Sequence, residues 1–315
     1  MRGLDIFCGG GGSSAGARAA GVQMVGAIDM CSVATKTYAA NFPNAHVVTS
    51  KLEDVSISGL KRQVGDIDVL ISSPECTNHS CAKGSAPRSE ASRETAMQVV
   101  EYARAFRPRW LVLENVVHMR PWSRYGDLKK MLEELGYKIR EQVLNAADFG
   151  VAQTRRRLFI VGDRMQEPVL VGAKRRGRKK SAASILDPSG TWRTTNLYDK
   201  TRAAATLERA KRGFDELGKN ADFLLVYYGT DGGGGWQRLD RPLRTITTID
   251  RFALVQQGNA GPQMRMLQVP ELKRAMGFDD EYSFPIGTRR DQIRLLGNGV
   301  CPPVMEEVLR ALTQS

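Results

Sequence analysis

The chain has 315 residues, enough for one large domain or two ordinary ones, and 42% of them are hydrophobic. Lysine and arginine outnumber aspartate and glutamate by 46 to 34; the net charge of +12 suits a polyanionic partner such as nucleic acid and equally a basic protein without one. No apolar run approaches the roughly 20 residues of a membrane helix, and the glycine-rich start is unlike a secretory signal, so we expect a cytoplasmic protein.

The first half of the chain alternates between strand-like and helix-like segments. Apolar strand candidates occupy residues 1–7, 22–29, 46–50, 66–73, 109–116, 137–149 and 155–163. Helical patterns occupy residues 9–21, 31–43, 93–108 and 126–137. This alternation predicts an α/β fold with a doubly wound, mostly parallel sheet.

The alternation stops near residue 165, where a basic run, KRRGRKK (174–180), begins a mixed region with a second glycine run (229–236). Residues 201–217, 270–278 and 302–315 have helical patterns, and residues 241–255 are expected to form β structure. We therefore predict a catalytic domain from residues 1–164 plus 290–315, with a smaller recognition domain and hinge at 165–289.

Four glycines, Gly9, Gly10, Gly11 and Gly12, follow the first strand directly and precede a helix. Glycine allows a ligand to approach the backbone closely, and a helix N-terminus carries partial positive charge. Asp29 ends the second strand, where an acid can bind ribose hydroxyls. Together they indicate an adenosine-containing cofactor, whereas an ordinary tight turn beside a surface acid is the simpler alternative.

Several chemically capable side chains follow the ends of the next strands. Cys76 stands in the polar stretch SSPECTNHS, after the strand that ends near residue 73. Glu114 and Asn115 end another strand, and QTRRR (153–157) carries Gln153, Arg155 and Arg157. Alternate residues of a strand share a face, so the two arginines could meet an anion together. Each has a simpler alternative: Cys76 could be an ordinary buried cysteine, Glu114 a helix cap, and the arginines a solvated strand end.

The combination resembles the DNA (cytosine-5)-methyltransferase family. Six motifs occur in the family's order: DIFCGGGG (5–12), SPEC (73–76), ENV (114–116), QTRRR (153–157), RPLRTIT (241–247) and GNGVCPPV (297–304). They span nearly the whole chain, and an unrelated nucleotide-binding oxidoreductase would explain only the first of them.

The resemblance implies a nucleophilic thiolate at Cys76 that adds to C6 of cytosine and makes C5 nucleophilic. Glu114 would hydrogen-bond N3 of the ring, with Asn115 and Gln153 in the same site. Arg155 and Arg157 would orient the base, which must be flipped out of the duplex. Cys81, five residues further on, is the alternative nucleophile.

The resemblance also implies S-adenosyl-L-methionine as cofactor, with S-adenosyl-L-homocysteine as product, and no metal. The residues expected to bind it are Phe7, Gly9, Gly10, Gly11, Gly12, Asp29, Met30, Pro74, Asn298 and Val300.

Four residues depart from the family's pattern. Glu75 stands where proline usually precedes the cysteine, and a carboxylate beside a thiol tends to raise its pKa. Thr77 replaces the usual glutamine after it. Lys51 occupies the place of an acid that meets the adenine, although Asp54 or Glu53 could serve in a shifted register. Met30 occupies the place of a stacking aromatic. These departures bear on rate and cofactor affinity.

The expected substrate is double-stranded DNA, recognised by the segment from about 165 to 240. A monomer in a bacterial or phage-infected cell is expected, with a restriction endonuclease as a possible companion. Two alternatives remain: methylation of RNA, as in the family's tRNA branch, and a catalytically impaired DNA-binding relative.

Overall fold

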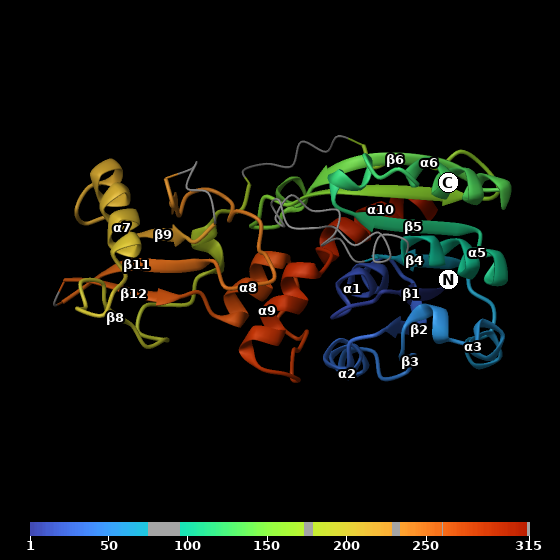
Figure 1. The fold of residues 1–315 in the computed structure, drawn as a ribbon, viewed down its shortest axis with the longest axis horizontal. Helices are drawn as coiled ribbons and strands as arrows, with labels where there is room; N and C mark the ends of the chain where they lie inside the picture. Colours follow the sequence, from blue (N-terminus) through green and yellow to red (C-terminus); the bar gives the residue numbers. More distant parts are fainter. Residues whose placement is uncertain (75–94, 173–178, 229–233, 260, 314–315) are drawn as a thin grey trace.

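A computed structural model describes residues 1–74, 95–172, 179–228, 234–259 and 261–313. It consists of a large sheet covered by helices and a smaller sheet at the other end of the molecule, with helices α8 and α9 between them (Figure 1). Within the described ranges, no helix is long and apolar enough to cross a membrane.

The large sheet has seven strands in the order β3-β2-β1-β4-β5-β7-β6. The first five in chain order pair in parallel, whereas β7 is antiparallel to both β5 and β6. The central strands β4 and β5 are buried along their full length, which explains their nearly continuous apolar sequences. The strands are β1 (Arg2–Ile6), β2 (Gln23–Asp29), β3 (His46–Thr49), β4 (Val69–Ser72), β5 (Trp110–Asn115), β6 (Lys138–Asn145) and β7 (Arg156–Asp163).

Helices cover both faces of this sheet, so the prediction of a doubly wound α/β fold is confirmed. One face packs against α1, α2 and α10, and the other against α3, α5 and α6. The sequence patterns did not predict α3. These helices are α1 (Gly12–Ala19), α2 (Ser32–Asn41), α3 (Ile57–Val64), α5 (Gln98–Phe106), α6 (Tyr125–Glu134) and α10 (Pro302–Thr313).

The small sheet is antiparallel, with strand order β10-β9-β11-β12-β8, and helix α7 packs on one of its faces. The expectation of β structure over 241–255 is corrected, because within this described range only the residues from Phe252 onward lie in a strand, β11. Earlier in the range, Leu243 forms an isolated β-bridge with Gln153. The elements are β8 (Thr195–Asn196), α7 (Ala204–Leu217), β9 (Phe223–Val226), β10 (Trp236–Arg238), β11 (Phe252–Gly258) and β12 (Gly261–Met266).

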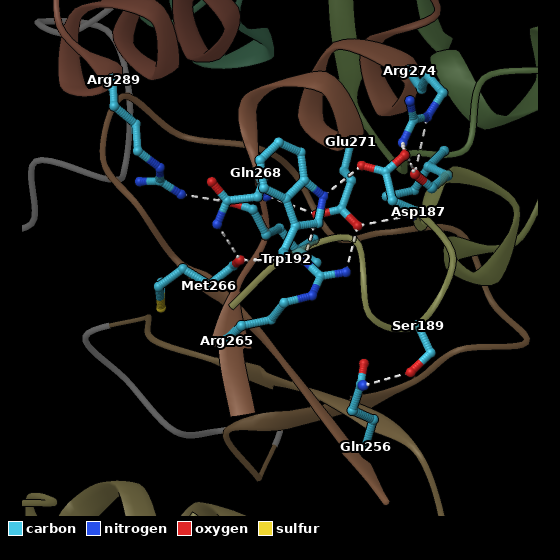
Figure 2. A network of polar contacts seen from close by, with 12 residues as sticks. Asp187, Ser189, Trp192, Gln256, Arg265, Met266, Gln268, Glu271, Arg274 and Arg289 are labelled. Carbon is cyan, nitrogen blue, oxygen red and sulfur yellow. Dashed lines mark hydrogen bonds and ion pairs between the residues drawn. The ribbon is translucent and has the colours of Figure 1, made fainter. Parts of the chain in front are cut away.

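After β12 the chain returns to the large sheet through α8 (Val269–Met276), α9 (Arg289–Asn298) and α10. A polar network at the start of α8 joins this return to the small sheet (Figure 2). Arg265 of β12 donates two hydrogen bonds of 2.7 Å to the Glu271 carboxylate, and both side chains are buried. Glu271 also accepts from the backbone N–H groups of Gln268 and Asp187.

We expect Glu271→Gln to lower the free energy of unfolding by about 3 kcal/mol, because it leaves the Arg265 guanidinium buried without its counter-charge. Urea unfolding of both proteins measures the difference. Asp240→Asn is the matched control: Asp240 pairs with Arg238 through a similar two-pronged contact, but at the surface, so its loss should leave stability unchanged. Equal effects of the two substitutions would contradict the role assigned to the buried pair.

Candidate active site

The glycine loop joins β1 to α1 in an unusual backbone conformation. Phe7 has φ +61°, Gly9 +51° and Gly11 +83°, and positive φ at a phenylalanine is strained. Among the described residues, a Cβ placed on Gly9 would meet no atom within 4 Å, so this part of the structure leaves the loop open there. A strained, glycine-lined opening beside a helix N-terminus suits close approach of a ligand to the backbone.

Asp29 ends β2 beside this opening. Its carboxylate accepts hydrogen bonds from the Gly9 N–H at 2.9 Å and the Cys31 N–H at 2.8 Å. Burial raises its pKa, and the two backbone hydrogen bonds oppose the rise. The next side chain, Met30, is 67% exposed, which is unusual for methionine and leaves an apolar surface beside Asp29. The structure thus brings the predicted glycines together with Asp29 and Met30.

The inner side of the loop is packed around Asp5 of β1. One carboxylate oxygen accepts from the hydroxyls of Ser13 and Ser14 at 2.6 Å each, and the Tyr38 hydroxyl donates to Ser14 at 2.8 Å. Within the described residues, the other oxygen, Oδ1, is buried without a hydrogen-bond partner. Asp5 stands at the head of the first motif, but the pattern around it did not predict this buried role.

The C-terminal motif comes back to this loop. A Cβ on Gly12 would lie 2.2 Å from the carbonyl oxygen of Val300, so glycine is required there by direct backbone contact. Asn298, in contrast, is exposed at the end of α9. Val300 therefore lies against the glycine loop, whereas the Asn298 side chain lies at the surface.

The end of β5 presents Glu114 and Asn115. The Asn115 amide donates to the Pro74 carbonyl at 3.2 Å, which fixes the backbone that leads into the cysteine stretch. Glu114 is 5% exposed, and its Oε1 lies 3.2 Å from Nε of Arg157, although among the described residues this oxygen makes no well-aligned hydrogen bond. Burial raises the pKa of Glu114, and the charges of Arg157 and Arg155 oppose the rise.

A small cavity of about 10 Å³, enough for roughly one water molecule, lies against Glu114. The predicted residues Arg155, Arg157 and Val300 share it, so the structure gathers residues from three of the motifs around one carboxyl group. Cys301 also lines it; nothing in its sequence context predicted this role. The full lining is Glu114, Leu144, Ala146, Arg155, Arg157, Phe159, Val300, Cys301 and Val304.

Arg155 and Gln153 are buried and bound to backbone. Arg155 donates to the carbonyls of Ile246, Gly297 and Gly299 at 2.7 to 3.0 Å. Gln153 donates to the Ala275 carbonyl and accepts from the Ile246 N–H. The Gln153 side chain therefore fastens the return segment to the sheet and does not line the cavity beside Glu114.

The nucleophile predicted at Cys76, its neighbours Glu75 and Thr77, and Cys81 lie outside the described residues. So do residues 174–178 of the basic run and 229–233 of the second glycine run. Their roles stay predictions. Lys51 is described, exposed, and directly precedes a short helical turn that contains Glu53 and Asp54.

The fold and the site define a doubly wound α/β protein with an open glycine loop after β1 and a buried glutamate–arginine pair at the end of β5. A family model for C-5 cytosine-specific DNA methylase matches residues 1–314, and the chain belongs to this family.

Similar proteins include bacterial modification enzymes. The Type II methyltransferase M.DdeI of Desulfomicrobium norvegicum is 33% identical over 172 residues, which cover 53% of this chain and 41% of the relative. M.SacI of Streptomyces achromogenes is 27% identical, over 91% of this chain and 83% of the relative. The matches span less than half the length of the first two curated relatives.

Among solved structures, Spodoptera frugiperda DNMT2 superposes with a TM-score of 0.72 at 16% identity and covers 99% of both chains. At this identity the likeness extends to the fold alone.

The buried Asp5 makes stability depend on pH. Burial raises its pKa to about 7, whereas the hydroxyls of Ser13 and Ser14 pull it down. Because the pKa of Asp5 is higher in the folded than in the unfolded state, its contribution to the free energy of unfolding is fully present below about pH 4. That contribution is lost as the pH rises towards 7, and the free energy of unfolding falls by roughly 4 kcal/mol. We expect Asp5→Asn, which cannot ionise, to gain stability relative to the unmodified protein over this window. Urea unfolding at pH 4 to 8 tests this; a difference that stays constant with pH would contradict it.

Proposed function

We propose that this protein transfers a methyl group from S-adenosylmethionine to C5 of cytosine in duplex DNA, on a base flipped out of the helix. The observation that carries the proposal is the buried Glu114 carboxyl at the end of β5, which lies 3.2 Å from Nε of Arg157 and also feels the charge of Arg155. Asn115 holds the Pro74 carbonyl two residues before Cys76 in the sequence, which supports a common site for the thiol and the carboxyl.

Cytosine C5 is a weak nucleophile, and the chemistry must activate it. The Cys76 thiolate adds to C6, which converts the ring into an enamine with electron density at C5. After C5 has accepted the methyl group, a base removes the C5 proton and the bond between C6 and sulfur breaks. Cys76 is released as the thiolate with which it began.

Glu114 would stabilise the charge that develops on the cytosine ring during the reaction. Its raised pKa favours a carboxyl that keeps its proton and donates it in a hydrogen bond to N3 of the cytosine. The charge of Arg157, 3.2 Å away, limits the rise in the pKa of Glu114, so that the carboxyl can still release its proton. Water exclusion by the apolar cavity wall strengthens each of these interactions.

The residues around the glycine loop fit S-adenosylmethionine. Gly9 and Gly10 would pass close to its methionine part, the Asp29 carboxylate has lone pairs left for the ribose hydroxyls, and exposed Met30 offers an apolar face to the adenine. When bound, the cofactor supplies an electrophilic methyl group on a sulfonium. The chain's own residues hold it, orient it and keep the neighbouring thiol and base aligned.

The small domain at 165–289 would recognise the DNA sequence, and the net charge of +12 supports phosphate binding. Arg202 and Arg244, two of the arginines that the sequence makes available, already donate to nearby side-chain and backbone acceptors, and Arg238 pairs with Asp240. Arg193, exposed before β8, is a further candidate for a DNA contact. A monomer acting in the cytoplasm, alone or beside a restriction endonuclease, completes the proposal.

Cys76→Ser should abolish transfer of labelled methyl from S-adenosylmethionine to duplex DNA, because the hydroxyl does not ionise at neutral pH and adds poorly to C6. Cys81→Ser, five residues away, is the matched control and should keep the activity. Label is measured on mixed-sequence DNA and, in parallel, on transfer RNA. Label on RNA alone would redirect the proposal to RNA, and no label with intact cofactor binding would favour a DNA-binding relative whose Glu75 impairs the thiol.

Glu114→Gln should lower kcat about 100-fold, because an amide cannot transfer a proton to N3. The pH profile gives the sharper test. In the unmodified enzyme the rate should fall as the pH rises through the raised pKa of Glu114, and this alkaline limb should vanish in the variant. Glu141→Gln serves as control, since Glu141 is an ion-paired glutamate on β6 outside the cavity. An unchanged profile in Glu114→Gln would exclude Glu114 as the proton donor.

A further inference from the structure

Tyr282 lies directly behind the glycine loop, in the segment between α8 and α9. Its hydroxyl donates a hydrogen bond of 2.6 Å to the carbonyl oxygen of Gly10, from 272 residues further along the chain. The side chain is 2% exposed. A hydroxyl from the return segment is thus bound to the backbone of the loop that opens towards the cofactor.

Gly11 provides the space for this contact. A Cβ on Gly11 would lie 2.2 Å from the Tyr282 hydroxyl oxygen, and its φ of +83° also disfavours any side chain. Burial raises the pKa of Tyr282 well above its usual range, so the phenol keeps its proton and remains a donor. The glycine at position 11 and the phenol at 282 are therefore two halves of one contact.

The phenol ring is fixed by three other aromatic rings. Its centroid lies 4.6 Å from that of Phe278, 5.6 Å from that of Phe284 and 6.3 Å from that of Phe42. Phe284 also approaches the loop, because a Cβ on Gly10 would come within 3.1 Å of it. The ring therefore has little freedom to turn, and the direction of its hydroxyl is set by packing.

The backbone of Tyr282 is held as firmly. The Lys273 ammonium at the end of α8 donates to the carbonyls of Asp280 and Tyr282 at 2.9 Å each, and the Asp279 carboxylate accepts from the Tyr282 N–H at 2.7 Å. Helix α8 is in turn joined to the small sheet through the pair of Arg265 and Glu271 (Figure 2). A continuous set of contacts thus runs from the small sheet to the glycine loop.

We infer that Tyr282 is a positioning residue for cofactor binding: its hydroxyl holds the Gly10 carbonyl and so aligns Gly9 with Asp29 on the open side of the loop. The inference rests on the proposed function, because it takes S-adenosylmethionine as the ligand of that loop. A tyrosine that only fills the core would contribute to stability, and its hydroxyl would have no selective effect on the ligand.

Tyr282→Phe separates these two roles, since it keeps the ring and removes only the hydroxyl. The control is Tyr137→Phe: Tyr137 is 3% exposed and also donates to a backbone carbonyl, that of Pro108 at 2.7 Å, in a different part of the fold. Both variants of the full chain should lose a similar few degrees in Tm. Only Tyr282→Phe should raise the Kd for S-adenosylmethionine, about tenfold by calorimetry.

The kinetics should show the same division. In Tyr282→Phe the KM for S-adenosylmethionine should rise about tenfold, while kcat at saturating cofactor stays within about twofold. Lys273→Met, which keeps the phenol but releases its backbone, should raise the Kd about threefold and provides a second route to the answer if Tyr282→Phe folds poorly. Without cofactor, amide hydrogen exchange at residues 9–12 should accelerate in Tyr282→Phe and not in Tyr137→Phe.

An unchanged Kd in folded Tyr282→Phe, or an equal rise in Tyr137→Phe, would overturn the positioning role while leaving the proposed function intact. Absence of S-adenosylmethionine binding by the unmodified protein would overturn both.

Discussion

Three backbone carbonyls, those of Ile246, Gly297 and Gly299, accept hydrogen bonds from the buried guanidinium of Arg155. Arg155 directly precedes β7, so this one side chain ties two distant segments to the end of the large sheet. Burying a guanidinium costs several kcal/mol unless its donors are matched. Here the three carbonyl acceptors offset part of that cost, and the chain beyond residue 246 is held where Val300 can meet Gly12.

The same arginine affects the chemistry of the cavity. Glu114 is buried, which favours the neutral acid, while Arg157 and Arg155 favour the carboxylate. The protonation of Glu114 therefore depends on a balance between desolvation and two nearby cations, and Arg155 cannot leave without also releasing the return segment. Structural and electrostatic roles coincide in this residue, so its truncation would be a poor test of catalysis, whereas Glu114 and Arg157 can be changed with less effect on the fold.

The sequence predicted the large sheet well, because its strands are short apolar runs between glycine turns and helices, and these signals are local. The small sheet was largely missed: β8 and β10 have only two and three residues, and their pairing partners lie far along the chain. Glu114 and Asn115 end β5, and the two arginines lie at the beginning of β7 or directly before it. Strand β7 runs antiparallel beside β5, so the residues that the sequence singled out come together here while their roles stay predictions. Asp5 and Tyr282 were missed because their contacts depend on tertiary packing, which no spacing in the sequence reveals.

Gln153 illustrates the limit of a motif more clearly than any element. It was grouped with the catalytic residues because it stands in QTRRR, yet its amide is used by the backbone of Ile246 and Ala275. Within one motif, Gln153 is thus bound to the return segment, whereas the side chain of Arg157 lies beside Glu114. The glycine loop shows the same division: Gly9 faces open space, whereas Gly10, Gly11 and Gly12 are each pressed by the return segment through Phe284, Tyr282 and Val300. Three of the four glycines are therefore explained by contacts with the C-terminal third of the chain, and Gly9 by its φ of +51°, which disfavours any side chain.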